Sequence, residues 1–200
     1  MNYLFHLFLA DDQSPEERLG TLMGDFAKGS IPSDLPLRVQ EGIRLHRLTD
    51  AAAQVDSSFH DSAFRLTPSL HHYRPLIIDI FYDHLLAVTW SSHHPLPLPI
   101  FSEGVYADLA LLRSLIPPNM VNVTDRMAAQ DWLSSYVDQE NIGRALAGVS
   151  RRLRHPVDLT LALPELNRHY HELLVDFRVL LPRLQLLVAG ARRDLSEESG

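Results

Sequence analysis

The stretch Pro75-Leu-Ile-Ile-Asp79-Ile-Phe-Tyr-Asp83-His84-Leu-Leu-Ala-Val-Thr-Trp90 decides the fold class. Apolar residues fill nearly every position between its few polar side chains, so they cover all sides of a helix rather than one side. A helix that is apolar nearly all round is a buried helix. We therefore expect one helix from about Pro75 to Ser91 in the interior of the protein.

Helical periodicity dominates outside this stretch as well, and strand-like alternation is nearly absent. A serine cap, a proline at the first helical position and two acidic residues make Ser14 to Glu17 a good helix start, and that helix runs to about Lys28. Another helix opens at Ser33. Further helices are expected at residues 100–115, 124–137, 139–153 and 162–190. The sequence therefore predicts an all-α protein.

The chain is expected to form a single helical domain over residues 1–190. Its 200 residues suit one domain with a sizeable core, and no repeat or low-complexity linker divides them. Pro182 is expected to kink or interrupt the last helix, because proline removes a backbone hydrogen bond. Residues 191–200 are charged and small, and we expect them to form a flexible tail.

Composition excludes several classes of protein and of site. The chain has no cysteine, which rules out disulfides, thiolate zinc sites, iron–sulfur clusters and cysteine nucleophiles. Its net charge of −7 argues against binding to nucleic acid or to an anionic membrane surface. No stretch approaches the roughly 20 apolar residues of a membrane span. The apolar run from Tyr3 to Ala10 lacks the flanks of a signal peptide, so we expect a cytoplasmic protein.

Three polar residues of the central helix, Asp79, Asp83 and His84, lie where apolar side chains are expected. Two carboxylates at i and i+4 repel each other, and burial raises the cost to several kcal/mol for each unpaired ion. A cation between them would relieve that cost, as would protonation. A network of ion pairs with arginines such as Arg44 or Arg47 is the structural alternative.

A histidine and a carboxylate also extend the apolar face of the helix that opens at Ser33. The face formed by Leu35, Val39 and Ile43 continues with His46 and Asp50, at the i, i+3 and i+4 steps of a helix. An i, i+4 pair places both side chains on one side. The pair is either a hydrogen-bonded His–Asp couple near a helix end or part of a site.

His6 and Asp25 are further polar residues within apolar segments. A single such histidine is more often a hydrogen-bonded core residue than a ligand, but this chain has several such exceptions. Histidine and aspartate without cysteine make a site of nitrogen and oxygen ligands, suited to Mn²⁺, Mg²⁺ or Fe²⁺, with Zn²⁺ as a further candidate. Metal-activated hydrolysis is the reaction class that follows.

One basic cluster stands out in this acidic chain. Arg151, Arg152 and Arg154 lie within six residues. They form either a helix C-terminus stabilised by its dipole or a surface that docks an acidic partner or clamps a phosphate.

Four segments together resemble the acyl carrier protein phosphodiesterase family. They are Met1-Asn-Tyr-Leu-Phe-His6-Leu-Phe-Leu-Ala10, Gly20-Thr-Leu-Met-Gly-Asp25-Phe, Gly42-Ile-Arg-Leu-His46-Arg-Leu-Thr-Asp50 and Asp79-Ile-Phe-Tyr-Asp83-His84-Leu. The resemblance extends from the first residue to about residue 185, and its specificity comes from the combined order and spacing of the segments.

The resemblance implies a helical domain similar to HD-type metal-dependent phosphohydrolases. It implies removal of the 4′-phosphopantetheine arm from holo-acyl carrier protein, with Mn²⁺ preferred. Carried onto this chain, the metal positions would be drawn from Asp25, His46, Asp50, Asp79, Asp83 and His84, with His6 beside them. The order Asp83-His84 reverses the His-Asp order of the HD signature.

The family's activity also suggests roles for the other singled-out residues. A metal-activated water would attack phosphorus after losing a proton to Asp25 or another carboxylate. Arg47 would clamp a phosphate oxygen, and Arg151, Arg152 or Arg154 would contact the carrier protein, which is acidic, or the phosphate.

Two other functions fit the same residues. The first is an HD-like phosphohydrolase whose substrate is a nucleotide or another small phosphodiester. The second is a helical module without catalytic activity that binds a carrier protein.

Overall fold

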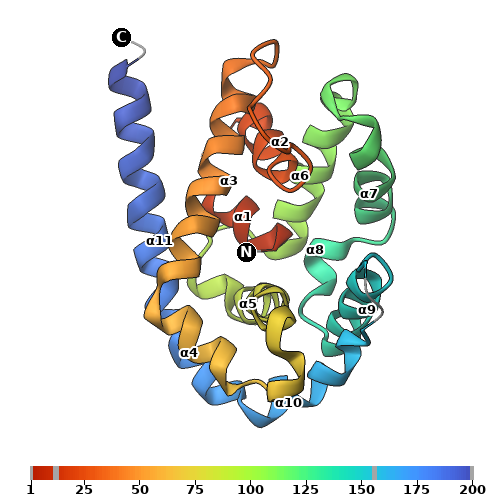
Figure 1. The fold of residues 1–200 in the computed structure, drawn as a ribbon. Helices are drawn as coiled ribbons and strands as arrows, with labels where there is room; N and C mark the ends of the chain where they lie inside the picture. The colour runs from red at the N-terminus through yellow and green to blue at the C-terminus, as the bar shows by residue number, and fades with distance from the viewer. Residues whose placement is uncertain (1, 11–13, 155–156, 199–200) are drawn as a thin grey trace.

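The structure, a computed structural model, describes residues 2–10, 14–154 and 157–198 (Figure 1). The described residues contain helices and no strand, so the predicted all-α class is confirmed. The α-helices are α1 (Tyr3–Leu9), α2 (Pro15–Met23), α3 (Leu37–Val55), α4 (Ser57–Arg65), α5 (Arg74–Thr89), α6 (Leu98–Leu111), α7 (Pro118–Ala129), α8 (Trp132–Ser135), α9 (Gln139–Ser150), α10 (Leu163–Arg168) and α11 (Tyr170–Glu198). Short 3₁₀ turns follow α4, α5, α6 and α9.

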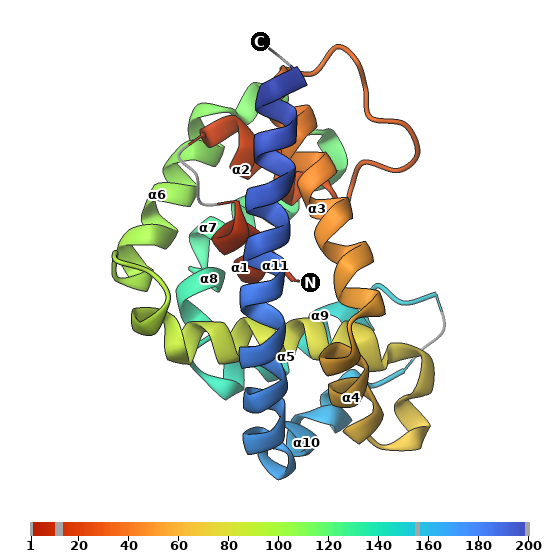
Figure 2. The same ribbon diagram turned by 90° about the vertical axis from the view of Figure 1, so that its left-hand side faces the viewer.

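Helix α5 forms the centre of the fold, as its apolar sequence predicts. Ile77, Ile78, Phe81 and Tyr82 are completely buried. The helix contacts α1, α4 and α9, and it crosses behind the long helix α11 in Figure 2. The carboxylate of Asp83 is also fully buried on this helix, so the core contains an acidic group that requires partners.

Helices α2 and α3 pack with their backbones in direct contact. A Cβ atom added to Gly20 would lie 2.1 Å from the carbonyl oxygen of Val39, and one added to Gly42 would lie 2.3 Å from that of Glu17. Only glycine leaves room for such an approach. The tight pair holds the end of α2 beside the middle of α3, where a histidine and an aspartate of the site are located.

The start of α2 agrees with the sequence prediction, whereas its end comes earlier. Ser14 caps the helix by accepting a hydrogen bond from the backbone N–H of Glu17, and Pro15 is the first helical residue. The helix ends at Met23 and continues only as a turn. Because of this early end, Asp25 lies in a turn rather than within a helix.

The last helix differs from its prediction. Pro182 lies inside α11 and does not interrupt it, and the helix continues through the predicted tail as far as Glu198. Residues 199–200 of that tail lie outside the described residues. Packing accounts for the continuity, because α11 buries Leu173, Phe177 and Leu180 against the rest of the protein. That burial offsets the single backbone hydrogen bond lost at proline.

Helix α4 was not expected, because residues 57–65 are largely polar. Its Asp56 cap accepts a hydrogen bond from the N–H of Ser58, and Phe59 and Ala63 face the core.

Within the described residues, no helix is both long and apolar enough to cross a membrane.

Candidate metal centre

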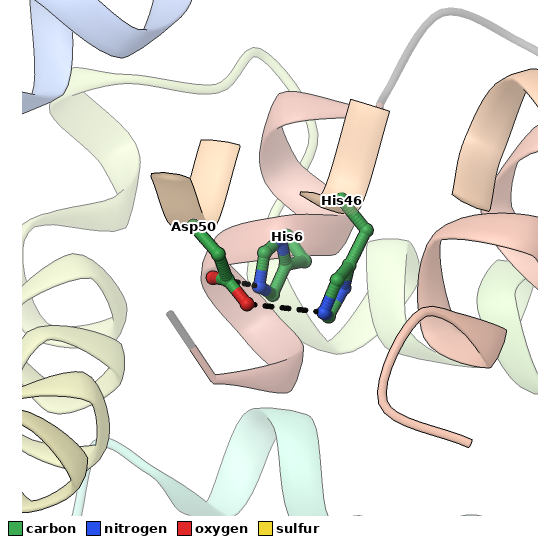
Figure 3. A group of neighbouring side chains, drawn as sticks. All are labelled: His6, His46 and Asp50. Carbon is green, nitrogen blue, oxygen red and sulfur yellow. Dashed lines mark ion pairs between the residues drawn. The ribbon is translucent and has the colours of Figure 1, made fainter. Parts of the chain in front are cut away.

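His6, His46 and Asp50 converge from two helices in the middle of the protein (Figure 3). Helix α1 supplies His6, and α3 supplies His46 and Asp50 one helical turn apart. One ligand atom from each residue lies within 4.8 Å of the others. Two of these residues were predicted to share one face of a helix, and the structure adds the histidine that meets them.

Asp50 joins the two histidines. Its Oδ1 lies 3.1 Å from Nε2 of His6, and its Oδ2 lies 3.2 Å from Nε2 of His46. The two imidazole rings are stacked, with their centroids 3.8 Å apart. Oδ1 of Asp25, in the turn after α2, lies 3.6 Å from the same Nε2 of His46. Both histidines are buried, whereas the Asp25 side chain is 45% exposed.

The two carboxylates give His46 a high proton affinity. Burial opposes the charged ring, but the hydrogen bonds with Asp25 and Asp50 outweigh burial and raise the pKa of His46 to about 9. The same contacts act on the carboxyl groups. Burial favours their neutral forms, but His46 holds the pKa of Asp25 and that of Asp50 below the usual range. In the absence of a cation, a proton on His46 neutralises part of this negative charge.

In His6, the effect of burial on the pKa outweighs that of the neighbouring carboxylate. Burial disfavours the charged form of the His6 ring and lowers its pKa to about 4, although the hydrogen bond with Asp50 raises the pKa. The ring is therefore neutral at physiological pH. A neutral imidazole is the form that binds a metal.

The donor set fits a divalent cation. Two imidazole nitrogens and an aspartate point to one place, and the carboxylate of Asp25 lies beside them. Nitrogen and oxygen donors suit Mn²⁺, Mg²⁺, Fe²⁺ or Zn²⁺. Nδ1 of His46 is buried and has no hydrogen-bond partner among the described residues, so the polar contacts of the ring are those of Nε2.

Asp79 of α5 borders this group. Burial raises the pKa of Asp79, and the negative charges of Asp50 and Asp25 raise it further. Its Oδ1 atom is buried. Both effects favour the protonated, neutral form of Asp79. Asp79 lies outside the convergent group of His6, His46 and Asp50, so its role as a metal ligand stays a prediction.

Asp83 and His84 do not join the cluster, although the sequence analysis placed them among the metal ligands. Asp83 accepts hydrogen bonds from the backbone N–H groups of Leu4 at 3.0 Å and Phe5 at 2.9 Å. Nδ1–H of His84 donates to the carbonyl oxygen of Tyr136 at 2.8 Å. The buried carboxylate of Asp83 thus satisfies the free N–H groups at the start of α1, the helix that carries His6. This contact explains the acidic residue in the core without a cation.

Replacing Asp83 by alanine is expected to lower the free energy of unfolding by about 1–2 kcal/mol, the cost of losing a helix cap. The variant should also bind Mn²⁺ more weakly, because a frayed α1 no longer fixes His6. Asp83→Asn keeps one acceptor and should lose less stability. Urea unfolding and a metal titration measure both effects. Equal stability of wild type and Asp83→Ala would contradict the capping role.

The pKa of Asp83 leads to a prediction of how stability changes with pH. Burial raises the pKa of Asp83 to about 7 in the folded protein, from a model-compound value of 3.8. Between these two values the folded state binds more protons than the unfolded state, so stability falls as pH rises through this window. The difference between wild type and Asp83→Asn, measured by urea unfolding from pH 4 to pH 8, should therefore change with pH. Parallel curves would contradict this assignment.

The comparisons with known proteins agree with the sequence resemblance. The sequence profile of the acyl carrier protein phosphodiesterase family matches residues 1–184. The chain belongs to this family. An acyl carrier protein phosphodiesterase of Enterobacter sp. (strain 638) is 28% identical over 187 residues, which cover 93% of this chain and 96% of the relative. The same-named protein of Salmonella dublin is 29% identical over 196 residues, 98% of this chain and 100% of the relative. No solved structure matches the chain.

The arginines that the sequence analysis assigned to phosphate or carrier-protein binding lie in three different environments. Nη2 of Arg47 donates to the carbonyl oxygen of Ala27 at 2.6 Å, so Arg47 holds the loop after α2 in place instead of facing the cluster. Arg151 and Arg152 line a cavity beside α9, and Arg154 is exposed outside that lining. Arg44 donates to Gln40, so neither Arg44 nor Arg47 is the ion-pair partner expected for the central helix.

Sequence reasoning missed other residues of this cavity, Arg126, Trp132 and Arg144. Each lies on a surface helix or beside one, and an arginine or aromatic residue there is usually a solvated side chain. Their convergence depends on how α7, α8 and α9 pack together, which a helical pattern does not reveal.

Proposed function

We propose that the chain hydrolyses the phosphodiester between 4′-phosphopantetheine and a serine of holo-acyl carrier protein. The products are apo-acyl carrier protein and free 4′-phosphopantetheine. The observation that carries the proposal is the convergence of His6, His46 and Asp50 in a chain that matches the phosphodiesterase family over residues 1–184. The reaction class fits this donor set, because hydrolysis of a phosphodiester is a reaction that a bound divalent cation catalyses.

His6, His46 and Asp50 would hold the cation, for which we propose Mn²⁺, with Mg²⁺ or Fe²⁺ as substitutes. A cation there supplies a Lewis acid that lowers the pKa of water and neutralises charge on phosphate. The family's HD-type relation is consistent with histidines and carboxylates that come from separate helices. A bound cation would favour the ionised form of Asp79 on α5, whose pKa is otherwise raised by burial and by the charges of Asp50 and Asp25.

Asp25 is the proposed proton acceptor. Its carboxylate lies at the edge of the cluster, is almost half exposed, and has a pKa that its hydrogen bond with His46 lowers against the effect of burial. It is therefore ionised at neutral pH. The oxygen of the attacking water forms a bond to phosphorus and its proton passes to Asp25, while the bond from phosphorus to the serine oxygen breaks. That oxygen takes up a proton and becomes the serine hydroxyl.

Mass spectrometry of the carrier protein tests the proposal. Purified chain with Mn²⁺ should convert holo-acyl carrier protein to the apo form, with loss of the mass of the arm and appearance of 4′-phosphopantetheine in solution. EDTA should prevent the conversion. A metal-loaded, folded sample that leaves the holo form intact would refute the proposal. Cleavage of a nucleotide that survives Arg151→Glu/Arg152→Glu would favour the small-phosphodiester alternative, whereas lack of metal binding would favour the non-catalytic module.

A further inference from the structure

A cavity of about 590 Å³ is lined by residues from the start of α1, from α5 and from the helices α7, α8 and α9. Its volume is in the range of pockets that bind small organic ligands. Its main polar residues are Arg126, Arg144, Arg151, Arg152, Asn122 and Asn141.

The cavity is cationic in a protein whose net charge is −7. Four arginines line it, and no aspartate or glutamate is among the described residues that do so. The guanidinium of Arg126 lies 5.7 Å from the ring centroid of Trp132, a cation–π contact that orients it. Arg144 is held on α9 by Glu140 at 2.6 Å and Asn141 at 2.9 Å. This concentration of arginine favours a phosphorylated or otherwise anionic ligand.

The rest of the wall indicates an elongated ligand with amide and apolar segments. Ile80, Val123 and Val149 provide apolar surface, and Trp132 provides an aromatic face. Side-chain amides face the same space from the residues Asn2, Asn122, Gln130 and Asn141. Amide groups both donate and accept hydrogen bonds, so they match peptide-like amides of a ligand.

One end of the cavity adjoins the metal centre through Tyr3. This residue lines the cavity and lies one helical turn before His6 on α1. Burial raises the pKa of Tyr3, the negative charge of Asp25 adds to that increase, and the neighbouring Arg152 opposes it. Tyr3 and Arg152 line the same cavity, and residues three apart on a helix are neighbours, so the part of the cavity at Tyr3 is the part beside His6.

We propose that this cavity binds the 4′-phosphopantetheine arm. Its phosphate would lie at the Tyr3 and Arg152 end, next to the metal centre, and its two amides and short apolar segments would extend past Asn141 and Trp132 toward Arg126 and Arg144. This inference rests on the proposed function. Arm binding is distinct from docking of the carrier protein. The free arm would contact the arginines of the cavity even when no carrier protein is attached to it.

Binding of defined probes tests the assignment. Wild type should bind free 4′-phosphopantetheine, detected by calorimetry and by the fluorescence of Trp132, and should bind pantetheine, which lacks the phosphate, at least about tenfold more weakly. Arg152→Gln, which removes the guanidinium beside the proposed phosphate position, should lower affinity for 4′-phosphopantetheine about tenfold or more. Ala145→Leu, which fills the cavity without removing charge, should do the same. Arg178→Gln removes an exposed arginine of α11 outside the cavity and should leave affinity unchanged.

Apo- and holo-acyl carrier protein separate arm binding from docking. The variants should weaken binding of the holo form and leave binding of the apo form unchanged. Equal weakening of both forms would overturn the assignment and make the arginines a docking surface. Cleavage of holo protein by a wild type that does not bind 4′-phosphopantetheine would also overturn it, with the proposed function intact. Binding of 4′-phosphopantetheine without cleavage would support the cavity and refute the proposed function.

Discussion

His46→Ala is expected to abolish metal-dependent cleavage of holo-acyl carrier protein, with turnover lowered at least about 100-fold. His46 is the residue through which the cluster is connected. Its Nε2 lies 3.2 Å from Asp50 and 3.6 Å from Asp25, and its ring stacks on that of His6. Removing it takes away one nitrogen donor and leaves two partly exposed carboxylates without the group that compensates their charge.

Asp50→Asn should produce a loss of similar size by a different route. The carboxylate contacts both histidines through separate oxygens. An amide keeps the volume but presents an oxygen at one position and an NH₂ group at the other, so one histidine loses its acceptor. The variant also lacks the negative charge that a divalent cation requires. We expect it to remain folded and to lose bound Mn²⁺.

His84→Ala is the matched control. It also removes a buried histidine, but one whose ring bonds to the carbonyl oxygen of Tyr136 and lies outside the cluster. Bound manganese, measured by elemental analysis after gel filtration, should be absent from His46→Ala and present in His84→Ala. The pattern of metal loss thus distinguishes the structural assignment from the sequence prediction, which included both histidines. Metal retained by His46→Ala and lost by His84→Ala would reverse the assignment.

The sequence predicted the helical class and part of the site for physical reasons that are local. An apolar stretch such as that around Ile77 and Phe81 requires burial whatever surrounds it. The His46 and Asp50 pair followed from helical spacing within one segment. Each prediction depends on residues within a single helix, so neither needed knowledge of how the helices pack.

The errors arose where partners come from distant segments. A buried carboxylate is stabilised either by a cation or by N–H donors, and the helical pattern around Asp83 is the same in both cases. The donors for Asp83 come from the start of α1, where Phe5 lies 78 residues away in the sequence. Arg47 was likewise predicted to face a phosphate, but the early end of α2 brings the carbonyl of Ala27 within its reach. Tertiary packing decides both outcomes.

Gly24→Ala is expected to disable the metal centre almost as completely as His46→Ala. Gly24 ends α2 directly against the imidazole of His46. A Cβ atom there would lie 2.2 Å from Cγ and 2.3 Å from Cδ2 of the ring, far inside van der Waals contact. The backbone of Gly24 is right-handed helical, so alanine brings no conformational strain. The added methyl group therefore acts by steric overlap alone, and the side chain that must move is that of His46.

Displacement of His46 is expected to affect metal binding more than folding. The added Cβ atom would also lie 2.7 Å from Cβ of His46, so relief of the overlap requires a shift of α2 against α3 as well as rotation of the ring. Both movements take the ring away from Asp25 and Asp50, so Mn²⁺ binding and cleavage should fall at least about 100-fold. Gly104→Ala is the matched control, because it makes the same substitution within α6 at a position where a Cβ atom meets nothing within 4 Å. It should keep full activity and gain up to about 1 kcal/mol of stability from higher helix propensity. Full metal binding by Gly24→Ala would mean that the His46 ring does not occupy its present position in the active protein.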